Sequence, residues 1–358
     1  MSAAKKRSKK HKKSFFKKIL ISLVALFLVG ASLSIYLGYR FIYQPNVSLK
    51  DRKTTYIYIP TGSKFQDVLK ILYENNMIRH HASFEWLAEQ KNYKNNVKPG
   101  KYLINVNMNN NELINLLRSG KQEPVKITFN SVRKKEELVS KICNKLEADS
   151  LSLINHLNDN DYLQQFALNK DNVLTLFIPN TYNLYWNTSA DEFMERMAKE
   201  HAAFWTNTRK EKAKQLDLSP AQVTILASIV EKEVMVNSEK PIVAGVYLNR
   251  LRKNMKLQAD PTVIYAVGDF SIRRVLNKHL QYDSPYNTYK YEGLPPGPIC
   301  IPNASSIDAV LNYTKHSYLF FCANEDFSGR HNFAATAKEH SINAKKFQAE
   351  LNRRGVNH

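Results

Sequence analysis

Cysteine is scarce in this chain of 358 residues. The three cysteines, Cys143, Cys300 and Cys322, have no paired spacing, and no histidine stands near them at the intervals typical of zinc ligands. Domains that depend on disulfides carry many regularly spaced cysteines, and structural zinc sites need clustered ligands. The scarcity therefore excludes a disulfide framework, and we expect no metal site and no cofactor.

The first eighteen residues contain no acid but nine lysines or arginines, and residues 19–39 contain no charge at all. Twenty-one uncharged, mostly apolar residues are long enough to span a bilayer. Because basic flanks stay in the cytoplasm, we predict a cytoplasmic tail over residues 1–18, a transmembrane helix over residues 19–39 and an exported remainder. A cleaved signal peptide is the alternative, but no small-x-small cleavage site with a polar start after it is evident.

The remaining charge does not indicate nucleic-acid binding. Of the formal net charge of +20, the basic tail supplies nine, which leaves 43 basic and 32 acidic residues in the rest of the chain. No basic stripe with interleaved aromatics stands out, so we expect no nucleic-acid partner. A moderately basic exported domain is suited to anionic phospholipid and to anionic cell-wall polymers.

A carboxylate occupies a position where an apolar residue is expected. Val223, Leu226 and Val230 lie on one stripe of a predicted helix, and Glu233 continues that stripe. A buried carboxyl has a raised pKa, which suits a general acid that works near neutral pH. The alternative is that an amphipathic helix ends in water at this point.

Glu231 is the competing candidate on the same helix. It lies on the neighbouring stripe with Thr224 and Ala227, which is more polar. We therefore expect Glu231 to be solvated or structurally hydrogen-bonded, with at most an accessory role in catalysis.

Polar and aromatic residues are concentrated downstream, in turn-forming contexts. Amides, hydroxyls and tyrosine rings suit a carbohydrate site, because sugars present hydroxyl groups and flat apolar faces. Turn capping before Pro261 and ordinary packing of the tyrosines are the alternatives. The segments are Asn249-Arg250-Leu251, Leu257-Gln258-Ala259-Asp260-Pro261-Thr262, Tyr286-Asn287-Thr288-Tyr289 and Gly293-Leu294-Pro295-Pro296-Gly297-Pro298-Ile299.

In this order and spacing the segments closely resemble the endolytic murein transglycosylase (MltG, or YceG-like) family. The family motifs correspond to residues 227–233, 249–251, 257–265, 286–289 and 293–299. The resemblance is dense in the second half of the chain, and the order of features upstream agrees with it.

The resemblance implies a membrane-anchored peptidoglycan lytic transglycosylase. Such an enzyme cleaves the bond between N-acetylmuramic acid and N-acetylglucosamine within nascent glycan strands, forms 1,6-anhydro ends and helps to terminate elongation. It would act outside the bacterial inner (cytoplasmic) membrane, on peptidoglycan strands, with peptidoglycan synthases or division proteins as further partners. A hydrolytic muramidase and a non-catalytic wall-binding division scaffold remain open.

By the same resemblance, Glu233 is the catalytic residue, in agreement with the stripe. One departure concerns the family's Pro-Asp-Thr-Tyr motif, which reads Pro179-Asn180-Thr181-Tyr182 here, so an acidic role at Asn180 is in doubt. The expected substrate-binding residues are Gln258, Asp260, Thr262, Tyr286, Asn287, Thr288 and Tyr289.

The exported part is expected to form two domains. Residues 54–122 read as strand 55–59, helices 64–75 and 83–90, strand 100–104 and helix 111–119, an order similar to the LysM-like region of the family. LysM modules bind glycans, but a structural spacer is an equal alternative.

Residues 125–351 are predicted to form a catalytic α+β domain dominated by helices, so that the fold class of the chain is α+β. We expect a strand at 125–129, one helix over residues 190–215, a helix that starts at Pro220 and a loop-rich segment at 255–303.

Overall fold

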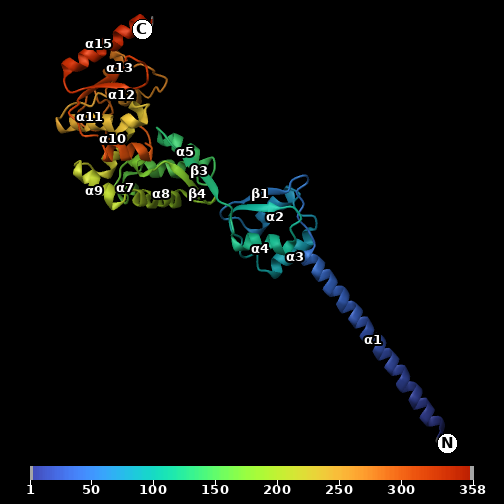
Figure 1. Cartoon of the computed structure of the whole chain (residues 1–358). Helices are drawn as coiled ribbons and strands as arrows, with labels where there is room; N and C mark the ends of the chain where they lie inside the picture. Colours follow the sequence, from blue (N-terminus) through green and yellow to red (C-terminus); the bar gives the residue numbers. More distant parts are fainter. Residues whose placement is uncertain (1–2, 355–358) are drawn as a thin grey trace. The chain divides into compact units, whose positions relative to one another are not determined.

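A computed structural model describes residues 3–354. The fold is mixed α+β, mostly helical, with three small two-stranded antiparallel sheets among the described residues (Figure 1). The chain divides into two compact units. The first comprises the chain up to Pro124 together with Tyr185–Asn187, and the second comprises Val125–Leu184 and the chain from Thr188 onwards.

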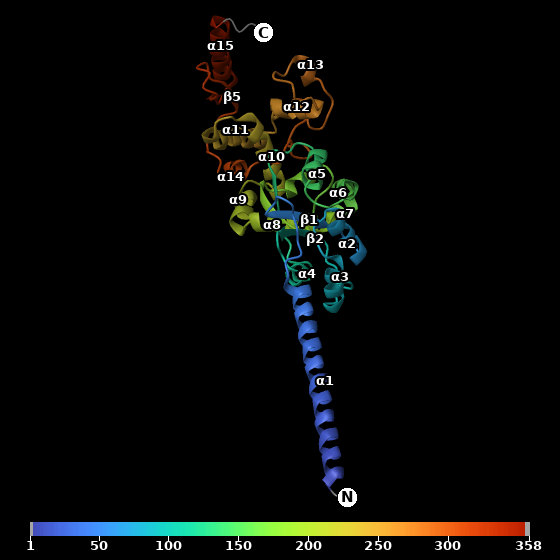
Figure 2. The same ribbon diagram turned by 90° about the vertical axis from the view of Figure 1, so that its right-hand side faces the viewer.

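The chain enters the first unit through helix α1 (Ala3–Tyr43). Its segment Phe15–Tyr43 reaches a mean hydropathy of 2.4 over an 18-residue window, none of which is buried. Both views show α1 as a long, unbroken rod (Figure 2). Length and composition allow a membrane anchor or a signal sequence, and the predicted segment 19–39 lies wholly inside this helix.

The first unit follows the expected β-α-α-β-α order. Its elements are β1 (Thr54–Ile59), α2 (Phe65–Glu74), α3 (His81–Gln90), β2 (Gly100–Asn105) and α4 (Asn110–Ser119). β1 and β2 pair so that Ile57 lies opposite Tyr102, and both side chains are buried in the core of the unit. Asn109 caps α4 by accepting from the Glu112 N–H at 2.9 Å, and Gly120 ends the helix in a left-handed conformation.

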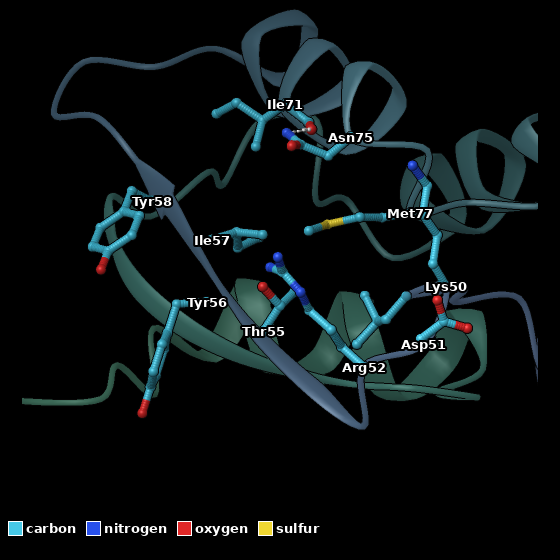
Figure 3. A pocket seen from close by; sticks show the side chains of 11 residues that line it. Lys50, Asp51, Arg52, Thr55, Tyr56, Ile57, Tyr58, Ile71, Asn75 and Met77 are labelled. Atoms are coloured by element: carbon cyan, nitrogen blue, oxygen red, sulfur yellow. Dashed lines mark hydrogen bonds between the residues drawn. The ribbon is translucent and has the colours of Figure 1, made fainter.

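A trough of about 680 Å³ runs beside β1 in the first unit (Figure 3). Arg52, Thr55 and Met77 line it, together with the tyrosine pair Tyr56 and Tyr58 on the strand. Both tyrosine side chains are exposed, because they alternate with the buried Ile57 and Ile59 along β1. The trough therefore combines charged, aromatic and apolar groups, and all of its lining residues belong to the first unit.

The second unit contains the remaining elements. They are β3 (Val125–Phe129), α5 (Lys135–Cys143), α6 (Ser150–Asn158), α7 (Asn160–Gln164), η1 (Val173–Leu176), β4 (Asn180–Leu184), α8 (Ala190–Phe204), α9 (Asn207–Gln215), α10 (Pro220–Glu233), η2 (Asn237–Glu239), α11 (Lys240–Arg252), α12 (Asp260–Val267), α13 (Asn277–Leu280), α14 (Ala304–Leu311), β5 (Phe320–Ala323), β6 (His331–Ala334) and α15 (Ala337–Arg353).

One expectation for this unit was wrong, whereas the expectation of a loop-rich segment at 255–303 is confirmed. The single helix over residues 190–215 is interrupted at Trp205, whose ring is buried, and Thr206 caps a second helix by accepting from the Arg209 N–H. The segment 255–303 is not only loop, since it contains α12 and α13. Pro261 stands in the first turn of α12, where its fixed φ and missing N–H are tolerated.

Helix α10 lies inside the second unit. Ser219 and Gln222 form a capping box at its start, and every residue from Val223 to Val230 is buried. The buried Ser228 accepts from the Ile299 N–H at 3.0 Å and so attaches the Gly-Leu-Pro-Pro-Gly-Pro-Ile segment to the helix. The stripe of Glu231 was expected to be the more polar one, with Glu231 solvated or structurally hydrogen-bonded, and Thr224 on that stripe is fully buried. Between its first and last turns α10 therefore has no solvated face.

Candidate active site

Glu233 is the last residue of α10, and its side chain enters a buried environment. The carboxyl oxygen Oε2 is buried and has no hydrogen-bond partner among the described residues. Burial, reinforced by the negative charge of Asp260, raises the pKa of this carboxyl to about 7, against the opposing effects of Tyr247 and Arg250. A carboxyl with this pKa is available both as an acid and as a base near neutral pH.

Glu231, two residues earlier, is fully engaged in hydrogen bonds. It accepts from Lys240 Nζ at 2.9 Å, from Asn303 Nδ2 at 2.5 Å and from the Ser306 hydroxyl. Burial alone would raise the pKa of Glu231, but the bonds from Ser306, Lys240 and Asn303 outweigh it and lower the pKa. Glu231 is thus hydrogen-bonded rather than solvated, and it joins α10 to α11 and α14.

Arg250 places a buried positive charge beside the Glu233 carboxyl. Its guanidinium donates to the carbonyls of Leu319 at 2.7 Å and Leu257 at 2.8 Å, and to Gln258 Oε1 at 3.2 Å. Arg250 therefore holds the segment before α12 against the start of β5. Gln258 itself has a positive φ of 49° and an exposed side chain, and its N–H donates to the Thr288 carbonyl.

Tyr247 is a residue of this site that the sequence analysis missed. It is 1% exposed, and its hydroxyl has no partner that meets normal hydrogen-bond geometry among the described residues. The hydroxyl nevertheless lies close enough to Glu233 to lower the pKa of that carboxyl, while burial and the Glu233 charge raise the pKa of Tyr247. Its position three residues before Arg250 on α11, and so on the same helix face, was the available signal.

Asp260 and Tyr289 complete the cluster. Asp260 is the first residue of α12 and accepts from the Tyr289 hydroxyl at 2.6 Å. Burial, the bond to Asp260 and the charge of Glu233 all raise the pKa of Tyr289. Asp260 was interpreted as a turn former or sugar ligand, and the structure places it at a helix start with an exposed side chain.

Three of the expected sugar ligands face inward instead. The Thr262 hydroxyl donates to the Ala259 carbonyl at 2.6 Å and bonds with the Thr288 hydroxyl at 2.8 Å. Asn287 Nδ2 donates to the carbonyls of Leu280 and Tyr282. Thr262, Asn287 and Thr288 are all buried, so their polar groups shape the segment and are not presented to a ligand.

Tyr286 lies beside a second aromatic side chain. Its ring centroid is 4.8 Å from that of Tyr265, and its hydroxyl lies 3.5 Å from the Asp171 carbonyl. A methyl group at Gly297 would stand 1.9 Å from that carbonyl oxygen and 2.8 Å from the Tyr286 hydroxyl. The absence of a side chain at Gly297 therefore permits this close approach.

Asn180 begins β4 with an exposed side chain, and its Oδ1 accepts from the Thr181 N–H at 2.7 Å. An aspartate could accept the same bond. The amide at this position therefore preserves the local hydrogen bond while removing a charge.

Comparison with known proteins places this arrangement in a family. The model of the YceG-like family matches residues 57–346. The chain belongs to the YceG-like family. The resemblance seen in the sequence motifs is thereby confirmed, and it extends from the first unit through the second.

Two curated relatives are named endolytic murein transglycosylase. The protein of Bacillus subtilis (strain 168) is 31% identical over 320 residues, which cover 85% of this chain and 88% of the relative. The protein of Streptococcus pneumoniae serotype 2 (strain D39) is 26% identical over 379 residues, covering 96% of this chain and 67% of the relative. A YceG-like protein from Listeria monocytogenes, solved by crystallography at 2.6 Å, is 27% identical with a TM-score of 0.53, covering 81% of this chain and 98% of that one.

Proposed function

We propose that this protein is a membrane-anchored endolytic peptidoglycan lytic transglycosylase. It cleaves the bond between N-acetylmuramic acid and N-acetylglucosamine within nascent strands and leaves 1,6-anhydro ends, which helps to terminate elongation. The observation that carries the proposal is the Glu233 carboxyl, whose buried Oε2 has no hydrogen-bond partner among the described residues and whose pKa is raised to about 7. The names of the curated relatives support the same activity.

In the first step Glu233 acts as the acid. The bond between the anomeric carbon of the muramic residue and the bridging oxygen breaks, its electron pair stays on the oxygen, and Glu233 supplies the proton that neutralises it. Positive charge develops at the anomeric carbon. The carboxylate of Asp260, which already raises the pKa of Glu233, favours that charge electrostatically.

In the second step the Glu233 carboxylate acts as the base. It takes the proton from the C6 hydroxyl of the muramic residue, whose oxygen then attacks the anomeric carbon and closes the anhydro ring. No water is consumed, and Glu233 returns to its protonated state. Arg250 and Tyr247 lower the pKa of Glu233 and so stabilise the carboxylate between the two steps.

A hydrolytic muramidase is the second candidate, and the position of Asp260 favours it. The charge of Asp260 acts on the Glu233 carboxyl, so the two groups could divide the roles of acid and water activator. Mass analysis of products from uncrosslinked strands separates the candidates, because an anhydro end is one water lighter than a hydrolytic end. Anhydro ends support the lyase, hydrolytic ends support the muramidase, and the absence of any cut would leave a wall-binding scaffold.

The remaining parts of the chain complete the proposal. Within α1, residues 19–39 span the inner membrane with residues 1–18 in the cytoplasm, so that residues 45–358 lie outside the cytoplasm. Residues 54–122 act as a LysM-like module that binds glycan or spaces the second unit from the membrane, and residues 125–351 form the catalytic domain. Peptidoglycan synthases or division proteins are the partners that such an enzyme would meet.

A further inference from the structure

A cavity of about 480 Å³ in the second unit lies beside the helix that carries Glu233. We name it the Phe270 pocket. It is formed by residues near the start of α5, by Lys232 in the last turn of α10 and by Phe270 in the segment after α12, and its basic and polar lining consists of Ser131, Arg133, Lys134 and Lys232. Nothing in the chemistry proposed for Glu233 uses these residues.

Three cations surround this pocket. The Arg133 guanidinium lies 4.4 Å from the Phe270 ring centroid, and Lys134 Nζ lies 5.4 Å from the same centroid. Lys232 Nζ donates to the Ser131 hydroxyl at 2.5 Å. Within the part of the chain that the structure describes, none of the three cations forms an ion pair with a carboxylate.

The two glutamates that also line the pocket do not neutralise it. Glu137 accepts from the Arg133 backbone N–H at 3.0 Å, and its other oxygen lies 3.7 Å from Lys141 Nζ on the next turn of α5. The charge of Glu136 acts on the neighbouring Lys135, whose pKa it raises against the larger lowering effect of burial. The pocket thus combines an excess of positive charge with one aromatic ring, a combination that suits a carboxylate carried on a partly apolar group.

The pocket and the candidate acid share one turn of helix. Lys232 directly precedes Glu233, and adjacent residues on an α-helix diverge by about 100°, so their side chains lie within roughly the 10–12 Å diameter of the helix. A substituent on the sugar bound at Glu233 could therefore reach the pocket. In peptidoglycan, the muramic residue carries such a substituent, a peptide with methyl side chains and free carboxylates.

We propose that the Phe270 pocket binds the carboxylate-bearing stem peptide of the muramic residue at the cleavage site, so that the enzyme favours strands that carry peptides over strands without them. The inference rests on the function proposed for Glu233. Arg133, Lys134 and Lys232 hold carboxylates, and Phe270 packs against the methyl groups of the peptide.

The test uses the full-length protein in detergent and compares two forms of one substrate. The first form is uncrosslinked glycan strands with their stem peptides, and the second is the same strands after an amidase has removed the peptides. The rate at which new glycan-strand ends form, measured over a range of substrate concentrations, gives kcat and KM for each form. The unmodified protein is expected to favour peptide-bearing strands by about tenfold in kcat/KM, the effect of a single charge-assisted contact.

The double variant R133Q/K134Q should reduce that preference to within about twofold, through a higher KM on peptide-bearing strands, with kinetics on stripped strands unchanged. The matched control K199Q/K210Q removes two positive charges from α8 and α9 and should keep the full preference. Soluble inorganic pyrophosphate is added as a competitor, because the cations of the Phe270 pocket could bind phosphate instead of the carboxylates of the peptide. If it abolishes cutting of stripped strands as strongly as that of peptide-bearing ones, the peptide assignment is overturned.

Equal cutting of both substrates by the unmodified protein, or a preference that survives in R133Q/K134Q, would overturn the inference and leave the lyase function standing. No new ends from either substrate would overturn both the function and the inference. Thermal unfolding of each variant accompanies the assay, and the stripped-strand rate verifies that R133Q/K134Q is folded and competent.

Discussion

The Tyr289 hydroxyl donates to Asp260 Oδ1 at 2.6 Å, across 29 residues of sequence, and joins the loop after α13 to the start of α12. The charge of the Asp260 carboxylate reaches Glu233, where it adds to the effect of burial in raising the pKa to about 7. Tyr289, Asp260 and Glu233 belong to three different family motifs. Tyr289 hydrogen-bonds the Asp260 carboxylate, and that carboxylate raises the pKa of the candidate acid Glu233.

The two glutamates of α10 should respond differently to loss of charge. Glu233→Gln keeps the size of the side chain but cannot transfer a proton, so turnover should fall by about two to four orders of magnitude with the melting temperature maintained. Glu231→Gln should instead destabilise the fold by about 1–3 kcal/mol, because Lys240 loses a buried partner. Product formation and thermal unfolding of both variants provide the measurement. A lower turnover in the folded fraction of Glu231→Gln than in Glu233→Gln would assign the acid to Glu231.

The pH dependence should follow the raised pKa of Glu233. As pH rises through about 7 the carboxyl loses its proton, so kcat/KM should fall above that pH. Because the folded-state pKa exceeds the ordinary value of 4.5, the folded state binds more protons between these two values. The contribution of Glu233 to stability is therefore full below about pH 4.5 and is lost as pH rises through 7. A pH–rate profile and pH-dependent unfolding test both points, and an unchanged stability profile in Glu233→Gln would contradict the second.

Removal of the Tyr247 hydroxyl should change the protonation of Glu233. Since Tyr247 lowers the pKa of Glu233, Tyr247→Phe should move the alkaline limb of the kcat/KM profile to higher pH. The ring remains packed 5.9 Å from Phe321, so the fold should be retained. Tyr93→Phe is the matched control, since it removes another buried, unpartnered hydroxyl from the first unit and should leave the profile unchanged. Identical profiles for the two variants would place Tyr247 outside the site.

The residues after α11 should separate into two groups. Asp260→Asn and Tyr289→Phe alter exposed or partly exposed groups near Glu233 and should lower turnover with little effect on the melting temperature. Thr262→Val and Asn287→Ala remove buried hydrogen bonds and should cost about 1–3 kcal/mol of stability each. Unfolding curves and turnover of the folded fraction distinguish the groups. Slow turnover of fully stable Asn287→Ala would restore Asn287 as a sugar ligand.

The topology predicted from α1 has its own test. With residues 1–18 in the cytoplasm and residues 19–39 in the membrane, a reporter fused after His358 should be active only if it is an enzyme that requires export. If a reporter that works only in the cytoplasm were active at the same fusion point, the predicted orientation would be wrong.

Local sequence patterns predicted many of the helices and strands. Helical periodicity and Pro220 predicted α10, since a first-turn proline acts within a few residues, and the structure adds Ser219 as its cap. The strand predicted at residues 55–59 is confirmed as β1, in which Tyr56 and Tyr58 alternate with buried isoleucines. The helix over residues 190–215 was misjudged at Trp205, because burial of that ring against the core outweighs continued helical propensity.

The sequence by itself determined the order of elements in the first unit, the apolar N-terminal segment, the family and the identity of Glu233 as the outstanding carboxyl, because periodicity, composition and motif spacing are properties of neighbouring residues. Only the tertiary structure decided the rest. It brought Asn303 and Ser306, 72 and 75 residues away, onto Glu231, and it left Glu233 Oε2 without a hydrogen-bond partner within residues 3–354. It also turned Thr262 and Asn287 inward while Asp260 stayed exposed. Whether a polar group is satisfied or available depends on partners distant in the chain, and local sequence does not specify them.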